Sequence, residues 1–395
     1  MLRVGIVGAG IGGLTAALCL LRVGVEVVVF EQATTLGEVG AGIQISPNAS
    51  RVLHKLDMAE ALARMAVRPR TGDLRRWQDW SLLTSQPLGE EVEARYGHPY
   101  YHVHRADLHG LLVSSLPEHT VRLKHRCTGL DATSHGMQVH FEDGEIDRFD
   151  VVIGADGIRS FVREALLGPE APRFSGLSAW RGLVPAERVA DLHLPVASTA
   201  VLGPGRHVVH YYVSAGRLVN WVAVAPTESW TIESWTSRGE LDEALADFDG
   251  WSPVVRQLMA HVGQSALFRW ALYDRDPLPR WGDGHVTLLG DAAHPMLPFM
   301  AQGAAQAIED AAVLARCLSS IDDPPAALRR YEDFRRDRTA EVQQAARQNA
   351  VLFHLPDGAE QQSRDARLGA QSGSQASHRN AWVFEYDVDK ATADL

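Results

Sequence analysis

Cysteine, lysine and long apolar runs are the scarce features of this sequence. Its three cysteines, Cys19, Cys127 and Cys317, lie far apart and form no CxxC pair. That spacing excludes a zinc cluster or a disulfide framework and fits a reducing cytosol. No run approaches the roughly 18 apolar residues of a membrane span. The chain opens on an apolar strand without a basic region or cleavage site, so we expect a cytoplasmic protein without a signal peptide.

Positive charge is carried almost entirely by arginine. Of the 38 Lys and Arg residues, only Lys55, Lys124 and Lys390 are lysines, so arginines or backbone N–H groups must bind any phosphate or carboxylate. The formal net charge is −11 and no basic run occurs, so no nucleic-acid partner is expected. With 395 residues, 46% of them hydrophobic, the chain is long enough for a large core and for two or three domains.

The N-terminal segment has the order strand, glycine loop, helix, strand. Residues 2–7 are an apolar strand, 8–13 a glycine loop, 14–21 an apolar helix and 25–30 a second strand. This order predicts a βαβ unit of the Rossmann type.

The glycine loop matches the pattern G-x-G-x-x-G. Gly8 permits a tight turn, Gly10 leaves room for a pyrophosphate, and Gly13 lets the helix pack closely on the strand. The helix N-terminus offers free N–H groups and a partial positive charge. Glu31, after the second strand, is placed to accept hydrogen bonds from ribose hydroxyls. The loop by itself does not separate FAD from NAD, and a tight glycine turn without a ligand is the alternative interpretation.

Two kinds of secondary-structure pattern alternate along the chain, and they predict two domains. Mixed strands and helices predict a Rossmann-type α/β domain in three pieces, residues 1–75, 100–172 and 278–350. Short strands, with most of the Trp residues, predict an inserted antiparallel-sheet domain for substrate, residues 76–99 and 173–277. The expected fold class is therefore α/β with an inserted sheet domain and C-terminal helices.

The C-terminal part is expected to be helical at first and irregular later. Helices are predicted at about 304–318 and 325–350. Residues 351–395 form a separate C-terminal segment, of which 358–379 is rich in Ser, Gln, Gly and Ala and is predicted to be mobile. This segment could serve an interface, and both a monomer and a homodimer remain open.

Two further motifs make a family visible. GADGIRS at 154–160 and LGDAAHP at 289–295 each follow an apolar strand. Together with the glycine loop they resemble the three fingerprints of the group A flavoprotein aromatic hydroxylases, among them the salicylate, 3-hydroxybenzoate and 6-hydroxynicotinate hydroxylases. The resemblance covers about residues 1–350. It implies FAD as cofactor, NADH or NADPH as co-substrate, and a small aromatic substrate together with O2.

The resemblance also implies cofactor contacts in both motifs and in the run YHVHRADL at 101–108. Asp291 is expected to bind the ribityl hydroxyls, because a carboxylate accepts two hydroxyl donors well. Arg105 is expected to reach the ribityl or phosphate region, and Asp156 with Gly157 to serve FAD and the nicotinamide cofactor. The alternatives are a capping role for Asp291 and an ordinary salt bridge for Arg105.

The loop at 295–304 is expected to hold the flavin ring. The helix that follows it begins near Gly303 and Ala304, and its N-terminus would point at the pyrimidine edge of the isoalloxazine. Because reduced flavin is anionic there, the helix dipole would lower the cost of reduction.

The reaction implied by the resemblance has two halves and requires no metal. NAD(P)H reduces FAD when substrate is bound, and O2 then forms a 4a-hydroperoxyflavin that an electron-rich ring attacks. A base near a substrate phenol would help, because phenolate is the better nucleophile.

The strand at about 206–213 carries the predicted base. Alternation puts Val208, His210 and Tyr212 on one face, and His207, Val209 and Tyr211 on the other. The pair His210-Tyr211 resembles the segment that carries the active-site His of 3-hydroxybenzoate hydroxylases. We therefore predict His210 as the catalytic base, a structural histidine being the alternative.

The remaining pocket residues are predicted to be Tyr212, Phe299 and Gln302. In the sheet domain no arginine is clearly predicted to bind a substrate carboxylate; Arg181 and Arg217 are the possible ligands, without further support from the sequence.

The leading function is hydroxylation of a phenolic or hydroxy-heteroaromatic acid. The alternatives are a monooxygenase of natural-product tailoring, a peroxide-forming flavin oxidase, and a non-catalytic flavin-binding redox module. Substrate-stimulated consumption of NAD(P)H separates a monooxygenase from a passive flavin binder.

Overall fold

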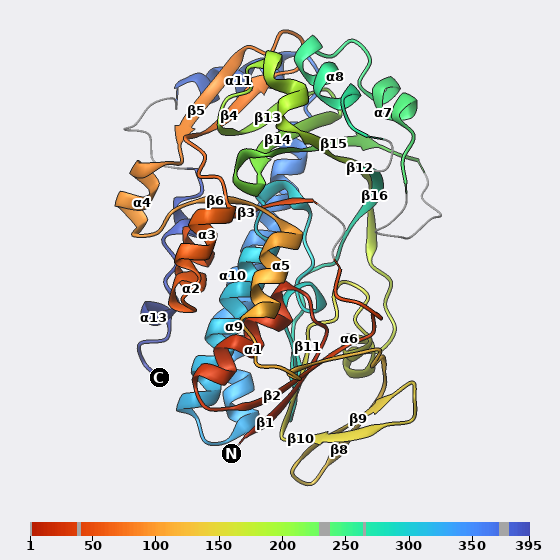
Figure 1. The fold of residues 1–395 in the computed structure, drawn as a ribbon, viewed down its shortest axis with the longest axis vertical. Coiled ribbons are helices and arrows are strands. Elements are labelled where there is room, and N and C mark those ends of the chain that lie inside the picture. The colour runs from red at the N-terminus through yellow and green to blue at the C-terminus, as the bar shows by residue number, and fades with distance from the viewer. Residues whose placement is uncertain (1, 38–40, 229–237, 264–265, 371–378) are drawn as a thin grey trace.

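The computed structural model describes residues 2–37, 41–228, 238–263, 266–370 and 379–395. Figure 1 shows a Rossmann-type half at the bottom and a sheet domain at the top, with helix α10 (Pro324–Phe353) running along both. None of the helices within the described ranges is both long and apolar enough to cross a bilayer.

The Rossmann half is built on a six-stranded sheet in the order β17-β18-β11-β1-β2-β7. Its strands are β1 (Arg3–Val7), β2 (Glu26–Glu31), β7 (Val121–Leu123), β11 (Val151–Gly154), β17 (Gly282–Asp283) and β18 (Val286–Leu288). All neighbours pair in parallel except β17 with β18. Strands β1 and β11 are almost wholly buried, as expected of a parallel sheet covered on both faces.

Short elements surround this sheet. They are α1 (Ile11–Arg22), β3 (Gly42–Ile45), α2 (Pro47–Lys55), α3 (Ala59–Met65), β6 (Tyr101–His104), α5 (Arg105–Ser114), β8 (Cys127–Thr133), β9 (Gly136–Phe141), β10 (Ile146–Phe149) and α6 (Phe161–Leu167). Strands β8, β9 and β10 form a small antiparallel sheet, and β3 pairs with β6. The helix pair α1 and α9 (Gly303–Ser320) packs in the core beside β1.

The sheet domain has seven strands in the order β16-β12-β15-β14-β13-β4-β5. They are β4 (Thr71–Arg76), β5 (Leu82–Pro87), β12 (Arg173–Pro185), β13 (Ala197–Gly203), β14 (Arg206–Val213), β15 (Leu218–Pro226) and β16 (Leu267–Asp274). One face is covered by α7 (Leu241–Asp247) and α8 (Pro253–Ala260), which close an apolar core. The opposite face is turned toward the Rossmann half (Figure 1).

The predicted domain boundary at residue 75 falls inside β4. This strand pairs with β13 along its whole length, so the crossing into the sheet domain comes before Thr71. Its sequence TGDLRR is mostly polar, and its one buried residue is Asp73, which is charged. Because the strand lacks alternation of apolar and polar residues, its first residue could not be predicted from the sequence. Helix α4 (Glu90–Tyr96) then leads back to β6.

The C-terminal segment is more ordered than its composition predicts. Residues 359–370 form helix α11 (Ala359–Ala370), which packs on β5, so the prediction of mobility is wrong there. Asp365 of α11 pairs with Arg76 of β4 and with Arg364, and these contacts outweigh the weak apolar pattern. The rest of the predicted mobile stretch, 371–378, lies outside the described residues. Helices α12 (Ala381–Phe384) and α13 (Val388–Ala391) lie along α2 and α9.

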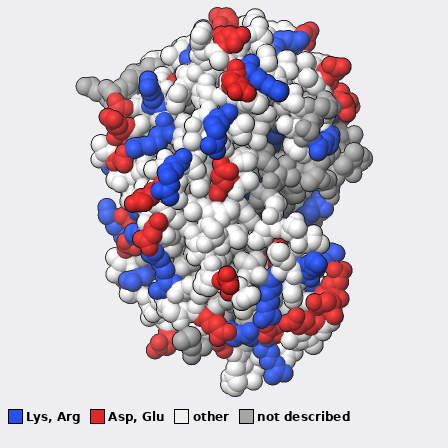
Figure 2. Space-filling model, viewed as in Figure 1, with Lys and Arg blue, Asp and Glu red and all other residues white. Residues whose placement is uncertain are grey.

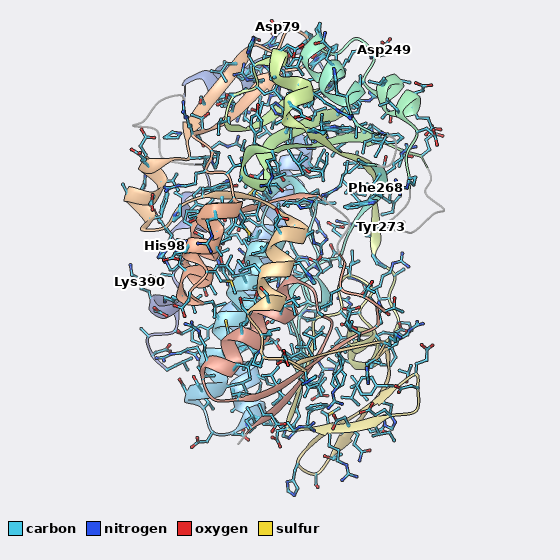
Figure 3. All side chains as sticks on the ribbon, viewed as in Figure 1. Asp79, His98, Asp249, Phe268, Tyr273 and Lys390 are labelled. Atoms are coloured by element: carbon cyan, nitrogen blue, oxygen red, sulfur yellow. The ribbon has the colours of Figure 1, made fainter. Side chains whose placement is uncertain are left out.

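Charge is distributed without a single-sign patch on the face shown in Figure 2, where Lys and Arg alternate with Asp and Glu. Figure 3 places Asp79 and Asp249 at the outer end of the sheet domain, and Phe268 and Tyr273 along β16, where it descends toward the Rossmann half. His98 and Lys390 lie on the flank formed by α2 and α13.

Candidate active site

A cavity of about 480 Å³ lies between the two halves of the molecule. Its Rossmann wall consists of the loops that follow β1, β11 and β18, together with the loop that leads into α9. Its other wall is one face of the seven-stranded sheet. Ligands of open α/β sheets bind outside the carboxyl ends of the strands, and this cavity has that position.

The glycine loop has the geometry that its pattern predicts. A Cβ atom at Gly8, where φ is +108°, would lie 2.4 Å from the Ala155 carbonyl oxygen, and one at Gly13 would lie 2.1 Å from the Gly8 oxygen. At Gly10, by contrast, a Cβ atom would meet nothing within 4 Å and would enter the cavity. Gly8 and Gly13 are therefore needed by the fold itself, while Gly10 keeps space open for a ligand.

Two helix N-termini open on the cavity. Helix α1 begins after Gly10 and helix α9 after Gln302, and neither has a side-chain cap or an acidic residue in its first turn. Gly303 and Ala304, the first residues of α9, line the cavity. Uncapped N–H groups and the positive ends of two helix dipoles favour anionic ligand groups there.

Three predicted cofactor residues meet at the cavity wall. Asp291 is surrounded by protein, yet its side chain is open to the cavity, and burial raises its pKa. Arg105 and Gly157 also line the cavity, and the charge of Arg105 acts on Asp291. Glycine at 157 adopts a φ of +81°.

Two other predicted cofactor residues are occupied by backbone contacts. Glu31 accepts hydrogen bonds from the N–H groups of Ala9 (3.0 Å) and Ala33 (2.9 Å). Asp156 accepts from the Ser160 hydroxyl and from the Val162 N–H group, 3.2 Å away, at the start of α6. Neither carboxylate is among the residues that line the cavity. A carboxylate has further lone pairs, so Glu31 still has acceptor capacity for a ribose.

A buried polar cluster holds the loop that follows β18. Asp310 of α9 accepts from the Gly290 N–H group (3.0 Å), binds the His294 ring (2.6 Å) and pairs with Arg335 of α10 (2.7 Å). Arg335 also pairs with Glu309, and all of these side chains are buried. The contacts fix the loop that presents Asp291. His294 thus has a structural role, since its ring binds the carboxylate that also holds the Gly290 N–H group.

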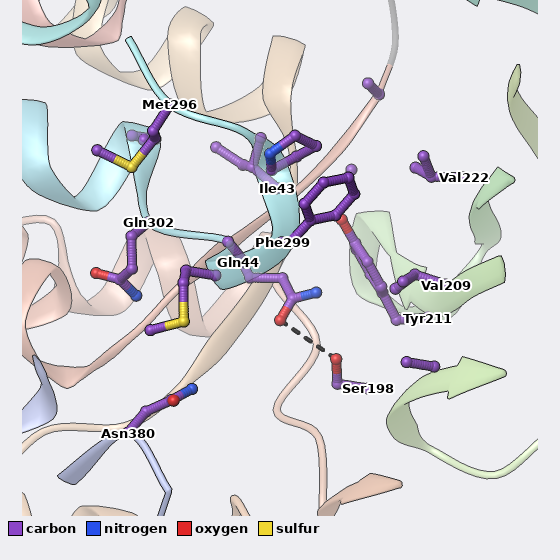
Figure 4. Close-up of a pocket in the computed structure, with 18 of the residues that line it drawn as sticks. Ile43, Gln44, Ser198, Val209, Tyr211, Val222, Met296, Phe299, Gln302 and Asn380 are labelled. Carbon is purple, nitrogen blue, oxygen red and sulfur yellow. Dashed lines mark hydrogen bonds between the residues drawn. The ribbon is translucent and has the colours of Figure 1, made fainter. Parts of the chain in front are cut away.

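The predicted pocket residue Gln302 belongs partly to this cluster. It borders the cavity, but its side-chain amide donates to the Ser46 hydroxyl (2.9 Å) and accepts from Asn48 (3.2 Å). Phe299 faces the cavity directly, with its ring edge-on to His207 at a centroid distance of 5.2 Å. Figure 4 shows Phe299 opposite Tyr211, Val209 and Val222 of the sheet.

The predicted base His210 and its neighbour Tyr212 lie on the wrong face of the sheet. The cavity is lined by the alternate residues His207, Val209 and Tyr211. His210 stacks on Trp80 (5.3 Å between centroids) on the side covered by α7 and α8, and burial lowers its pKa to about 3. Tyr212 donates to the Leu194 carbonyl oxygen at 3.5 Å. The placement of His210 in the substrate pocket is therefore wrong, and the structure brings His207 there instead.

His207 is held by a second histidine. Its Nδ1 lies 2.7 Å from Nε2 of His354, just beyond the end of α10. Burial lowers the pKa of His207 far below its usual value and that of His354 to about 4. Both imidazoles are thus neutral at pH 7, and the pair shares one hydrogen bond.

A chain of hydroxyl and amide groups crosses the cavity wall. Tyr100 and Ser198 donate their hydroxyl hydrogens to Gln44 Oε1 at 2.6 and 3.2 Å (Figure 4 shows the second bond). With both donors on Oε1, the orientation of the amide is determined.

Several proteins with similar sequences are named aromatic-ring monooxygenases or hydroxylases. A family described as FAD binding domain matches residues 1–348. The 3-amino-4-hydroxybenzoate 2-monooxygenase PtmB3 of Streptomyces platensis is 44% identical over 387 residues, 98% of this chain and 96% of that protein. The 6-hydroxynicotinate 3-monooxygenase of Pseudomonas fluorescens is 38% identical over 89% of this chain and 91% of that protein.

The chain belongs to the group A flavoprotein aromatic hydroxylases.

Two solved structures share the fold of this hydroxylase. A salicylate hydroxylase substrate complex has a TM-score of 0.84 and 30% identity, covering 99% of this chain and 97% of that one. HpxO of Klebsiella pneumoniae, complexed with FAD and uric acid, has a TM-score of 0.86 and 27% identity, with the same coverage. FAD is the cofactor of the family, and its hydroxylases use NAD(P)H as co-substrate.

The residues of this hydroxylase agree with FAD binding. The diphosphate would meet the open space at Gly10 and the N-terminus of α1. Asp291 is open to the cavity where ribityl hydroxyls need an acceptor, and the N-terminus of α9 faces the same space.

Sequence reasoning missed several polar groups of the cavity lining in the hydroxylase. They are Gln44 on β3 and, on the seven-stranded sheet, Ser198, His207 and Tyr211, while Arg181 was named without a role. The alternation of β14 had already grouped His207 with Tyr211. Alternation cannot say which face meets the Rossmann half, because both faces of this sheet are covered and carry apolar residues.

Proposed function

We propose that this enzyme uses NAD(P)H and O2 to hydroxylate a benzoate that carries an activating amino or hydroxyl group. The observation that supports the proposal most directly is the cavity, in which Asp291 and the N-terminus of α9 lie across from the polar sheet face with His207 and Tyr211. The aminohydroxybenzoate monooxygenases, 44% identical over nearly the whole chain, make 3-amino-4-hydroxybenzoate the first compound to test.

The chain supplies the positioning, and the cofactor supplies the oxygen chemistry. FAD, when bound and reduced by NADH or NADPH, provides an electrophilic oxygen derived from O2. In 3-amino-4-hydroxybenzoate, C2 is ortho to the amino group, whose lone pair enriches that carbon when the amine is unprotonated. Wall groups that accept a hydrogen bond from the amine or the phenol therefore favour attack on the oxygen.

His207 is the proposed acceptor on the sheet wall. When its Nδ1–H donates to His354, 2.7 Å away, its Nε2 keeps a lone pair for a substrate O–H or N–H group. Burial lowers the pKa of His207, so the imidazole stays neutral and ready to accept at pH 7. His207 takes the place that the sequence assigned to His210.

Tyr211 is the proposed donor. Tyr211 lines the cavity, and burial raises its pKa, so its hydroxyl stays protonated at neutral pH and can donate its hydrogen to a substrate oxygen. The apolar side chains of Val209, Val222 and Phe299 line the space between these groups and limit the access of water (Figure 4).

Anaerobic stopped-flow reduction tests the proposed function. The purified flavoprotein is mixed with NADH or NADPH, alone and with 3-amino-4-hydroxybenzoate, 3-hydroxybenzoate, salicylate or 6-hydroxynicotinate. We expect one acid to accelerate the bleaching of the flavin at least about tenfold, and the same acid to be hydroxylated in air. Chromatography of the aerobic products identifies the ring position.

Two results would contradict the proposal. If no acid accelerates reduction while a larger aromatic compound does, the enzyme belongs to natural-product tailoring of another substrate class. If reduction is fast without any ligand and the only product in air is H2O2, the enzyme is an oxidase.

A further inference from the structure

Arg181 of β12, which is partly exposed to the cavity, stands apart from the buried arginines. Within the described ranges the buried arginines each pair with a carboxylate; they are Arg163, Arg275, Arg335 and Arg364. Arg181 lines the cavity and has no carboxylate partner there; its guanidinium lies over the Trp270 ring, 4.5 Å from the centroid. Its Nε is buried and makes no hydrogen bond with the described residues.

An unpaired cation in this position is unfavourable for the ligand-free protein. Removing a guanidinium from water is costly unless an anion and hydrogen-bond acceptors replace the water. The stacking of the guanidinium on Trp270 offsets only part of this desolvation free energy. Burial lowers the pKa of Arg181 to about 10, so the side chain still carries its charge at neutral pH. The site therefore lacks one component, an anion.

The surroundings of Arg181 place the missing anion at the substrate. Its cross-strand neighbour on β15 is Val222, whose partner on β14 is Val209, and both valines line the cavity. His207 and Tyr211 flank Val209 on the same face of β14. Strands β12 and β14 are two strand spacings apart, about 10 Å, a separation that a small aromatic acid spans with hydrogen bonds at both ends.

The two other arginines of the cavity are less suited to this role. The charge of Arg105 acts on Asp291, on the wall assigned to FAD. Arg379, near the C-terminus, donates to Asn349 Oδ1 at 3.5 Å and lies on a segment outside both domains. Arg181, by contrast, projects from the middle of the longest strand of the sheet, so its position is well determined.

We propose that Arg181 binds the carboxylate of the aromatic substrate and so selects acids over neutral phenols and anilines. The inference rests on the proposed hydroxylation of a benzoate and adds the group that recognises its charge. A planar guanidinium presents two parallel N–H donors to a carboxylate, which orients the ring as well as binding it. The aromatic ring of the substrate would then lie against Val222 and Val209, with His207 and Tyr211 beside it.

The test compares a matched pair of ligands on matched variants of the FAD-loaded enzyme. The ligands are 3-amino-4-hydroxybenzoate and 2-aminophenol, which differ only in the carboxylate. The variants are Arg181→Gln and Arg269→Gln. Arg269 is an arginine of the same sheet that also stacks on a tryptophan, 4.4 Å from the centroid of Trp180, but on the face of the apolar core away from the cavity. Dissociation constants come from the change in flavin absorbance, and reduction rates from stopped flow.

We expect Arg181→Gln to weaken binding of the acid by about 30-fold or more and that of 2-aminophenol by less than about threefold. Arg269→Gln should keep the preference of the wild-type enzyme for the acid. Equal losses for both ligands in Arg181→Gln would overturn the inference. So would an unchanged acid preference combined with weaker FAD binding, since Arg181 would then serve the flavin.

Stability gives a readout that does not depend on turnover. Without ligand, Arg181→Met should melt at the same or a higher temperature than the wild type, because a partly buried charge without a carboxylate partner is removed. The rise in melting temperature that the acid causes in the wild type should be lost in this variant. A large fall in the melting temperature of ligand-free Arg181→Met would show a structural role instead.

These results are separable from failure of the proposed function. If wild-type enzyme binds the acid through Arg181 but forms no hydroxylated product, the anion site stands and the reaction is wrong. If product forms and the variant keeps its acid preference, the reaction stands and the role of Arg181 is wrong.

Discussion

Two histidines of β14 lie in unlike environments, because they point to opposite faces of the sheet. His207 lies in the cavity wall beside Phe299 and His354, whereas His210 lies on the other face against Trp80. Both rings are buried, and in both burial lowers the pKa, so charge does not distinguish them. Position alone makes His207 the candidate for contact with substrate.

Replacing each of these histidines by Asn separates their roles. His207→Asn should lower the rate of hydroxylation at saturating substrate by roughly 10²-fold, because a proton acceptor is lost. His210→Asn should leave that rate within about twofold. The rates are measured as hydroxylated product against time over pH 6–9. A larger loss of rate in His210→Asn than in His207→Asn would show that His210, as predicted from the sequence, and not His207, is the proton acceptor.

The glycine loop offers a second contrast between single residues. A methyl group at Gly10 would enter open space, while one at Gly13 would lie 2.1 Å from a backbone oxygen. Gly10→Ala should therefore weaken FAD binding without changing the thermal stability of the apoprotein. Gly13→Ala should lower the free energy of unfolding by about 1–3 kcal/mol, through forced movement of the helix. Flavin fluorescence titration and apoprotein melting measure the two effects, and the reverse pattern would contradict the assignment.

At the scale of elements, α9 and α10 are joined by a buried ionic cluster. Arg335 of α10 pairs with Glu309 and Asp310 of α9, and Asp310 in turn holds the Gly290 N–H group and His294. Despite burial, Arg335 and Arg338 hold the pKa of Glu309 below its usual range, and His294 and Arg335 do the same for the pKa of Asp310. Through this cluster the long helix supports the loop that carries Asp291.

Removal of the central cation should be severe. Arg335→Met leaves two buried carboxylates with reduced compensation, so the free energy of unfolding should fall by about 3–5 kcal/mol. Arg336→Met is the matched control, because Arg336 is a third exposed and pairs with Glu332 in a bridge of the kind worth about 1 kcal/mol or less. Urea denaturation of both variants is the measurement. Equal effects would show that the cluster contributes little to stability.

At the scale of the whole molecule, buried neutral histidines make stability depend on pH. Burial lowers the pKa of His102 and His210 to about 3 and that of His354 to about 4. In the unfolded chain each of them titrates near its ordinary value of about 6.5. Below that pH the unfolded state binds protons that the folded state does not. The free energy of unfolding should therefore fall as the pH drops from about 6.5 toward 4, by up to about 1.4 kcal/mol per pH unit for each histidine.

Unfolding in urea at pH 7.5, 6.5 and 5.5 measures this dependence at constant FAD occupancy. His210→Asn should reduce the slope between pH 6.5 and 5.5, because one of the contributing groups is removed. His135→Asn, at an exposed position, should leave the slope unchanged. The same slope in all three proteins would show that carboxylates, and not buried histidines, govern the acid limb.

Part of the site could be predicted because its residues are close in sequence to the elements that carry them. The turn at Gly8, the space at Gly10, and Asp291 after β18 follow from local strand, loop and helix patterns. The boundary of β4 and the helix α11 could not be predicted. Their stability comes from pairing with β13 and from the contact of Asp365 with Arg76, both between residues distant in sequence.

The sequence by itself determined that this chain is a flavin hydroxylase with a Rossmann-type domain and an inserted sheet, since three local motifs carry that information. Only the tertiary structure decided which face of β14 meets the cavity, and it put His207 and Tyr211 there. Only the tertiary structure showed that Arg181 has no acid beside it in the described part of the chain. The physical reason is the same in both cases. Alternation along a strand defines two faces, but the packing of distant helices and loops decides what each face meets.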